Sequence, residues 1–192
     1  MAIKFVFQTL EDKGNPDYVE NSGPFPCHRK NAWLGDGYYF WDSFIENAHW
    51  WGCEGARYAN GYFICKANYD FEESSCFNLI DNPEHFQLFN NTKKIMQEKG
   101  LYVTNQTTVS RIIEHIKNTL KIFKYEAIRV YGINSKSFNS PYSNRTIFDQ
   151  KHNAKYLDSL PAIQIFFYSK TSLNLRNYTL IYPPEYTDDY LV

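Results

Sequence analysis

The sequence predicts a single α+β domain that spans residues 1–192. Runs of β-branched and aromatic residues, such as residues 3–9 and 161–168, alternate with segments whose apolar residues recur at helical spacing, most clearly over residues 109–123. A chain of 192 residues suits one domain whose core is large enough to need no disulfide or metal.

The N-terminal part of the chain is predicted to form a strand and then a loop. Residues 3–9 (IKFVFQT) have the composition of a strand and are followed by a polar turn. Residues 16–31 contain three prolines and a glycine, which favours a loop. His28, Arg29 and Lys30 make this loop cationic, so it could meet a pyrophosphate, or its charges could simply be solvated.

The stretch from Ala32 to Trp51 joins a glycine turn, an aromatic strand and a helix. Gly35 and Gly37 permit either a turn with positive φ or a close approach of the backbone to a ligand. Residues 38–41 (YYFW) are predicted to be the strand that follows. The turn is therefore predicted to form the edge of a site.

The helix after this strand is expected to begin at Asp42 or Ser43, because either side chain can accept hydrogen bonds from the first free amides. Asn47 and Trp50 are three residues apart and could edge a cleft whose other wall is the aromatic strand. Such a cleft would suit a flat heteroaromatic ring. A core-facing stripe at helical spacing is formed by Phe44, Ala48, Trp51 and Gly55.

A second helix is predicted over residues 83–100. Asn82 followed by Pro83 has the pattern of a cap and a first-position proline, and a glycine ends the segment. Asn90 and Asn91 could interrupt this helix.

The apolar stripe of residues 109–123 predicts a third helix, with His115 beside the stripe at the surface or at its boundary. Residues 134–149 are polar, and a loop of that length is often functional. The remaining strands are predicted at residues 61–69, 76–80, 126–133, 161–168 and 177–182.

Composition excludes several functional classes. Hydrophobic residues make up 43% and aromatic residues 18%, which predicts a folded chain, and the net charge of −1 argues against a generally basic nucleic-acid-binding domain. The four cysteines lack the spacing of a metal site, so no metal is expected. No apolar run is long enough to span a membrane, and no leader is apparent, so we expect a cytoplasmic protein with reduced thiols.

The motif GDGYYF, followed by NAHWW, resembles the glycine turn, aromatic strand and helix of the ADP-ribosyltransferase superfamily. This fold is shared by poly-ADP-ribose polymerases and many bacterial toxins. The resemblance implies split mixed or antiparallel sheets flanked by helices, with NAD as substrate. It places the nicotinamide ring between Tyr39 and Trp50, with Asn47 at the position of the helix serine. The alternative is that Tyr39 and Trp50 are packing residues only.

Two positions depart from the pattern of this superfamily. The first strand of the family carries a His or Arg and then Ser or Thr, where this chain has Phe7, Gln8 and Thr9. Phe7 cannot hydrogen-bond a ribose, so Thr9 and Gln8 would have to orient the substrate. The catalytic Glu of the late strand corresponds to Gln164, or Glu126 could replace it. Gln164 could equally be a solvated residue at the rim of the sheet.

The resemblance implies NAD-dependent transfer of ADP-ribose to a macromolecular acceptor, which could be protein, DNA or RNA, in the manner of a toxin or defence effector. Tyr39 and Trp50 would stack on the nicotinamide, Gly37 would permit close approach, and Gln164 would contact the ribose. Such enzymes need no metal, because NAD brings its own leaving group. One alternative is a binding module of the same fold without turnover, and another is hydrolysis of NAD to free ADP-ribose.

Overall fold

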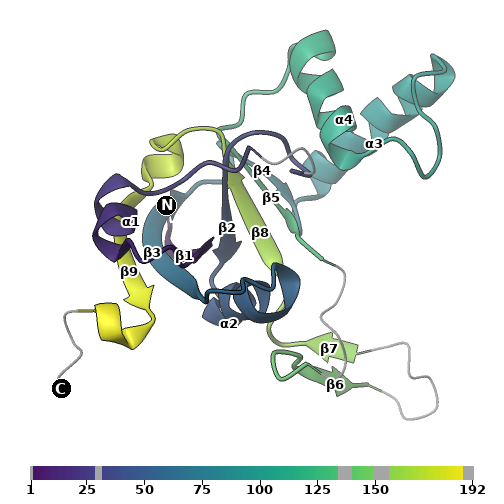
Figure 1. Ribbon diagram of the computed structural model, residues 1–192. Coiled ribbons are helices and arrows are strands. Elements are labelled where there is room, and N and C mark those ends of the chain that lie inside the picture. Colours follow the sequence, from purple (N-terminus) through teal and green to yellow (C-terminus); the bar gives the residue numbers. More distant parts are fainter. Residues whose placement is uncertain (1, 29–31, 134–139, 149–155, 188–192) are drawn as a thin grey trace.

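The computed structural model describes residues 2–28, 32–133, 140–148 and 156–187. Its centre is a seven-stranded mixed sheet flanked by helices, which confirms the predicted α+β class (Figure 1). The strands lie in the order β4-β5-β8-β2-β1-β3-β9. They are β1 (Ala2–Glu11), β2 (Tyr38–Asp42), β3 (Tyr62–Phe71), β4 (Cys76–Leu79), β5 (Ala127–Tyr131), β8 (Ile163–Phe167) and β9 (Arg176–Tyr182).

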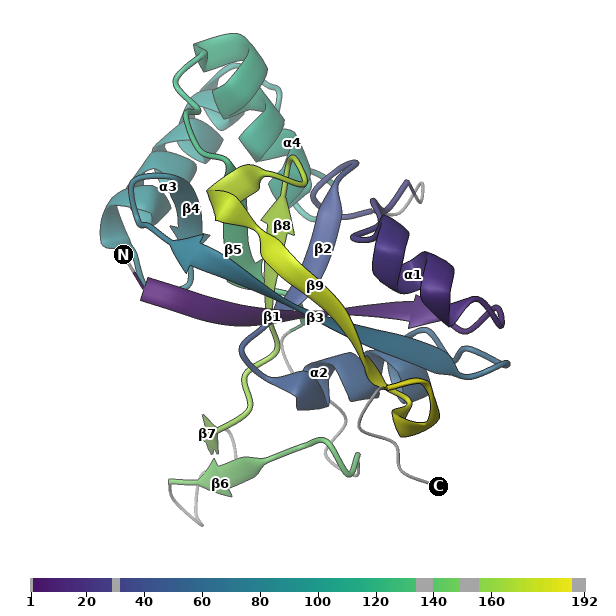
Figure 2. The ribbon, with the colours of Figure 1, turned by 90° about the vertical axis from the view of Figure 1, so that its left-hand side faces the viewer.

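The pairing of β1 is unequal on its two sides. With β3 it pairs antiparallel along its whole length, from Ala2 to Glu11. With β2 it pairs only at Val6↔Asp42 and Phe7↔Trp41. The second half of β1 therefore follows β3 and leaves β2, which opens the sheet between β1 and β2 (Figure 2).

The first helix, α1 (Pro16–Ser22), lies in the segment predicted to be a loop. Pro16 stands at the first helical position, which its fixed φ favours. The buried Val19 packs in a cluster with Phe63 and Leu180. Seven residues are too few to show a helical period in the sequence, so the prolines dominated the prediction.

The helix after β2 begins later than predicted. It comprises α2 (Ile45–Trp50) and a π-helical turn, η1 (Trp51–Gly55), and no side chain caps its first turn. The predicted caps are wrong because Asp42 ends β2 and accepts a hydrogen bond from Arg129, whereas Ser43 has a φ of 69°.

The other two long helices lie where the sequence predicted them. Asn82 caps α3 (Pro83–Glu98) by accepting a hydrogen bond from the amide of His85, and the two asparagines do not interrupt the helix. The next helix is α4 (Val109–Glu114), which continues as a π-helix, η2 (His115–Leu120). His115 was expected at the surface or at its boundary, but it is buried, because η2 packs this side of the helix against the protein.

Helices cover one face of the sheet at two places. Register places Phe7, Trp41, Phe166 and Ile128 on this face, which we call the pocket face. The helix α2 packs over Phe7 and Trp41 through Ala48. Ile113 of α4 and Ile116 of η2 pack over Phe166 and Ile128. The two helical regions therefore stand at opposite ends of the pocket face, with a gap between them (Figure 1).

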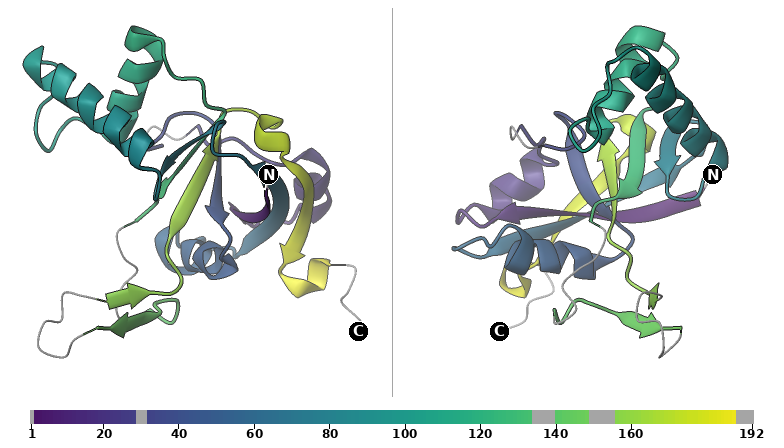
Figure 3. Two further views of the ribbon diagram at one scale, coloured as in Figure 1. Left: turned by 180° about the vertical axis from the view of Figure 1, so that it is seen from behind. Right: turned by 90° about the vertical axis from the view of Figure 1, so that its right-hand side faces the viewer.

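The rest of the described structure lies at the C-terminal side and in a small ribbon. Two short 3-10 turns, η3 (Ser172–Asn174) and η4 (Pro184–Tyr186), flank β9. The strands β6 (Arg145–Ile147) and β7 (Tyr156–Asp158) form a separate antiparallel pair that projects from the body of the molecule (Figure 3). The predicted polar segment 134–149 includes β6, but residues 134–139 and 149 lie outside the described residues.

Candidate functional site

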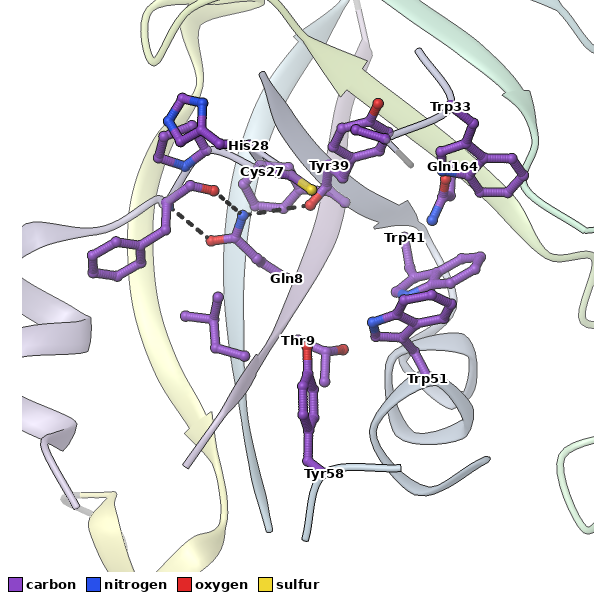
Figure 4. Close-up of a pocket in the computed structure, with 15 residues that line it drawn as sticks. Gln8, Thr9, Cys27, His28, Trp33, Tyr39, Trp41, Trp51, Tyr58 and Gln164 are labelled. Atoms are coloured by element: carbon purple, nitrogen blue, oxygen red, sulfur yellow. Dashed lines mark hydrogen bonds between the residues drawn. The ribbon is translucent and has the colours of Figure 1, made fainter. Parts of the chain in front are cut away.

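A cavity of about 280 Å³ lies where β1 and β2 separate (Figure 4). It is lined by residues of β1, β2, β8 and η1 and by the loops at 25–28 and 32–33. Among the described residues, its aromatic walls are Phe25, Trp33, Tyr39, Phe40, Trp41, Trp51 and Tyr58. The cavity thus lies between the two helical regions of the pocket face and reaches into the split of the sheet.

The split has a simple cause in the register of the strands. If the β1–β2 ladder continued in the same register beyond Phe7↔Trp41, Thr9 would lie opposite Tyr39. The strands separate before that pair, so the backbone edges of both residues border the cavity. Backbone edges without a neighbouring strand offer hydrogen-bonding groups to whatever enters.

Gln8 holds the split open. Its side-chain amide accepts a hydrogen bond from the Phe25 amide (3.0 Å) and donates one to the Phe25 carbonyl (2.8 Å), as a neighbouring backbone would. The Tyr178 hydroxyl donates to the same Gln8 oxygen at 2.8 Å, and Gln8 Nε2 lies 3.5 Å from the Tyr39 carbonyl. Gln8 lines the cavity, and its polar atoms are bonded to the protein, so its predicted role in orienting a substrate stays a prediction.

Thr9 lines the same cavity and ties β1 to the neighbouring helix. Its hydroxyl donates to the Ala48 carbonyl at 2.9 Å. The hydroxyl oxygen keeps its acceptor capacity for a ligand. Thr9 therefore anchors α2 and presents an acceptor at the cavity wall.

Tyr39 uses its hydroxyl to hold the glycine turn. The hydroxyl accepts a hydrogen bond from the Leu34 amide (2.8 Å) and donates one to the Gly35 carbonyl (2.9 Å). Burial raises the pKa of Tyr39 to about 12, although the hydrogen bond from Leu34 acts in the opposite direction. Gly35 has a φ of +98°, as predicted for a tight turn. The ring of Tyr39 borders the cavity and packs edge-to-face on Phe166 at 5.1 Å.

Gly37 makes its close approach to the protein itself. A Cβ added at Gly37 would lie 2.5 Å from the Phe166 ring and 2.8 Å from the Phe167 carbonyl oxygen. Its carbonyl accepts a hydrogen bond from the Cys27 amide at 2.7 Å. Gly37 does not line the cavity, so it shapes the turn rather than the cavity wall.

The two predicted helix residues also lie outside the cavity. Asn47 is fully buried, and its side chain donates to the Pro161 carbonyl at 3.0 Å. Trp50 packs edge-to-face on Trp41, with 6.1 Å between the ring centroids. The neighbouring Trp51 lines the cavity instead. The helix begins at Ile45, later than predicted, and continues from Trp51 as a wider π-helical turn. Its residues therefore face other directions than in a regular α-helix that begins at residue 43.

Gln164 lies in β8, where it pairs with Trp41 of β2. Only 6% of its surface is exposed, and its Oε1 is buried with no hydrogen-bond partner among the described residues. The side chain packs against Gly132, where an added Cβ would lie 2.8 Å from Gln164 Cγ. It extends toward Trp41 and Trp33 at the wall of the cavity (Figure 4). The prediction that Gln164 sits at a solvated sheet rim does not hold.

No described residue that lines the cavity is an Asp or Glu. Glu126, the predicted substitute carboxylate, lies at the other end of β8, where its side chain accepts a hydrogen bond from the Leu173 amide at 3.0 Å. His28 borders the cavity, and its Nδ1 lies 3.5 Å from Asp36 at the exposed rim. Arg29 and Lys30 of the predicted cationic group lie outside the described residues.

The described residues contain no cluster of three or more His, Cys, Asp or Glu side chains that could hold a metal ion. Within the same part of the chain, no helix has the length and apolar character to cross a membrane. Comparison of the chain with protein-family models, curated proteins and solved structures gave no match.

Sequence reasoning singled out five residues of the cavity wall, His28 among them, and missed Trp33, Trp51 and Tyr58. Gln8, Thr9, Tyr39 and Gln164 converge, although their positions span the chain. Trp51 was assigned to the core by its helical spacing, and Trp33 and Tyr58 stand in loops. The density of tryptophans around residues 33–51 was the one signal in the sequence that pointed to them.

Proposed function

We propose that this chain binds NAD with its nicotinamide end in the cavity and transfers ADP-ribose to a macromolecular acceptor. The adjacency of three strands supports the proposal. The sheet order places β8, β2 and β1 side by side, so Gln164, Tyr39 and Thr9 meet at one cavity. These are the positions at which the resemblance to ADP-ribosyltransferases requires substrate-binding groups.

The observation that carries the proposal is the buried, unpartnered oxygen of Gln164 beside aromatic walls. A buried acceptor without a partner costs roughly 1–3 kcal/mol. Because this oxygen is closed to solvent, a ligand in the cavity would donate to it once the Gln164 side chain turns toward the cavity. The faces of Trp41 and Trp51 suit a planar ring. A nicotinamide riboside offers both features, because it joins a flat heteroaromatic ring to amide and hydroxyl donors.

The size of the cavity limits which part of NAD is enclosed. The cavity volume of about 280 Å³ lies just below the usual range for ligand sites, which begins near 300 Å³. The nicotinamide and the adjoining ribose would occupy the cavity, and the pyrophosphate and adenosine would extend past the rim at His28 and Trp33. Both rim residues border the cavity.

The chemistry follows from what the cavity offers to a departing nicotinamide. Breaking the bond between nicotinamide and ribose leaves a positively charged, oxocarbenium-like sugar, which the acceptor nucleophile then attacks. In this proposal the faces of Trp41 and Trp51 stabilise the cation, an effect worth about 0.5–2 kcal/mol. Gln164 orients a ribose hydroxyl but supplies no negative charge. We therefore expect slow turnover compared with a site that contains a carboxylate.

A second candidate function is a binding module of the same fold that holds NAD without turnover. The absence of Asp and Glu from the described residues of the cavity wall favours it. Hydrolysis of NAD to free ADP-ribose would use the same cavity, with water in place of the acceptor. The substitution Gln164→Glu distinguishes an enzyme from a binding module. It adds the missing negative charge, so it would raise the rate of turnover if the chain is an enzyme and would give no turnover if the chain only binds NAD.

The test is incubation with NAD labelled on the adenylate phosphate in the presence of mixed cell extract. The native chain is compared with Trp51→Ala, which removes a cavity wall, and with the matched control Trp50→Ala, which removes the neighbouring indole outside the cavity. Binding of NAD to each protein is measured in parallel by titration calorimetry. We expect label on protein or nucleic acid with the native chain and the Trp50→Ala variant, and its loss with Trp51→Ala.

The other outcomes separate the candidates. Binding that Trp51→Ala abolishes, without transfer of label even for Gln164→Glu, would support the binding module. Release of free labelled ADP-ribose would indicate hydrolysis. An absence of NAD binding to the folded native chain would contradict both candidates.

A further inference from the structure

The helical region at residues 83–125 carries a positive charge that the rest of the chain lacks. These residues include seven Lys or Arg and three Asp or Glu, whereas the remainder has 13 basic and 18 acidic residues. The net charge of −1 for the whole chain therefore conceals a cationic region with a net charge of +4. We call residues 83–125 the cationic hairpin.

The basic side chains of the cationic hairpin face solvent. The helices α3 and α4 project from one end of the sheet (Figures 1 and 3). Lys94, Lys99, Lys117, Lys121 and Lys124 are all exposed. None of these five lysines has a carboxylate of the described residues within ion-pair distance. Their charge is therefore available to a partner.

Part of this charge lies next to the cavity. The Lys117 ammonium lies 4.1 Å from the centroid of the Tyr168 ring. Tyr168 packs edge-to-face on Phe166, which packs in the same way on Tyr39 of the cavity wall. Lys121 follows the last residue of η2, where the backbone leaves the helix with a φ of 56°. The rings of Tyr168 and Phe166 thus connect Lys117 to the cavity wall.

An exposed tryptophan lies between the cationic hairpin and the cavity. Trp33 is 43% exposed and lines the cavity. The residue after it, Leu34, packs in one cluster with Ile113 and Ile116 of the cationic hairpin. An exposed indole together with lysines that have no carboxylate partner is the combination that binds single-stranded nucleic acids, with bases stacked on the ring and phosphates on the cations.

We propose that the cationic hairpin binds single-stranded nucleic acid, with phosphates along Lys117 and Lys121 and a base stacked on Trp33. This binding does not depend on the proposed NAD chemistry. An anionic membrane fits less well, because membrane-surface helices insert a continuous apolar side. Here the apolar side of α4, with Ile112 and Ile113, is buried against the protein.

The test measures binding of a fluorescent single-stranded oligonucleotide by anisotropy between 50 and 200 mM salt, in the range where phosphate contacts dominate affinity. The variant Lys117→Glu/Lys121→Glu is compared with the control Lys13→Glu/Lys170→Glu, which changes the net charge equally at exposed lysines outside the cationic hairpin. We expect at least a tenfold loss of affinity at 50 mM salt in the first variant and less than a twofold loss in the control.

The salt dependence provides a second readout. Each phosphate contact to a single strand contributes about 0.7 to the slope of log affinity against log salt, so loss of two contacts should lower the slope by about 1.4. Circular dichroism and thermal unfolding establish that both variants are folded. Equal loss in the two variants, no binding by the native chain at 50 mM salt, tighter binding to duplex, or binding only to anionic vesicles would overturn the proposal.

Discussion

Among single residues, the side chains that line the cavity differ in whether their polar atoms are hydrogen-bonded to the protein. The polar atoms of Gln8 and Tyr39 are hydrogen-bonded to the protein. Gln8 bonds the backbone of Phe25, and the Tyr39 hydroxyl bonds the turn at Gly35. Gln164 is the exception, since its buried oxygen has no partner among the described residues. A polar group that weakens the fold is expected to remain where function requires it.

The first prediction concerns this unpartnered oxygen. Gln164→Met keeps the length of the side chain and removes the buried acceptor, so we expect the free energy of unfolding to rise by about 1 kcal/mol. NAD binding should fall in the same variant, because the ligand loses its acceptor. Urea unfolding and titration calorimetry measure the two effects. A loss of stability together with unchanged NAD binding would show that Gln164 serves packing only.

At the scale of elements, a buried ion pair fastens the sheet across three strands. Arg129 of β5 donates to Asp42 of β2 at 2.7 Å, although β8 lies between the two strands. The hydroxyl of Tyr69 in β3 donates to the same carboxylate at 3.3 Å. Asp42 is 1% exposed at its side chain and Arg129 is 10% exposed. The pair therefore joins the half of the sheet with β4 and β5 to the half with β1 and β3.

Removal of one partner of this ion pair should lower the free energy of unfolding much more than replacement of both partners. Asp42→Ala leaves the buried guanidinium with only the exposed Asp81 carboxylate, at 3.5 Å, among the described residues, and we expect a loss of about 3–5 kcal/mol in the free energy of unfolding. The double variant Asp42→Leu/Arg129→Met should recover most of that loss, since no charge is then buried. Chemical denaturation of the two variants measures the difference. If the double variant is as unstable as Asp42→Ala, the pair acts through geometry rather than through charge.

The secondary structure was predictable where local chemistry decides it. Asn82 and Pro83 predict the start of α3, and the alternation of β-branched and aromatic residues predicts the central strands. The start of α2 was not predictable, because Asp42 has the side chain of a helix cap and is instead bonded to Arg129, 87 residues away. The widening of two helices into π-helical turns has no marker in the sequence that we recognise.

At the scale of the whole molecule, the cavity depends on long-range register that a single sequence does not contain. The residue types of Gln8, Tyr39 and Gln164 could be singled out from their motifs. Their convergence requires β1 and β2 to pair at only two positions and β8 to lie beside β2. Trp51 lines the cavity where the sequence predicted Trp50, because α2 begins later than predicted. The ion pair of Asp42 keeps that residue from capping the helix.

The abundance of buried aromatic residues makes the whole fold sensitive to alkaline pH. Burial raises the pKa of Tyr39 and of Tyr168 to about 12, and it also raises the pKa of Tyr69 and Tyr178. The ordinary pKa of tyrosine is about 10. Between these two values the unfolded chain loses protons that the folded chain retains, so stability falls as pH rises.

We therefore expect the stability from these tyrosines to be fully present below pH 10 and to be lost as the pH rises through about 12. Loss of helical circular dichroism should accompany the rise of tyrosinate absorbance between pH 10 and about 12, because the unfolded chain ionises there while these hydroxyls keep their protons in the folded chain. Tyr39→Phe removes one such hydroxyl, but it also removes the hydrogen bonds at Leu34 and Gly35, so it lowers stability at neutral pH. Tyrosinate absorbance that saturates while the circular dichroism is unchanged would show that these hydroxyls reach solvent in the folded state.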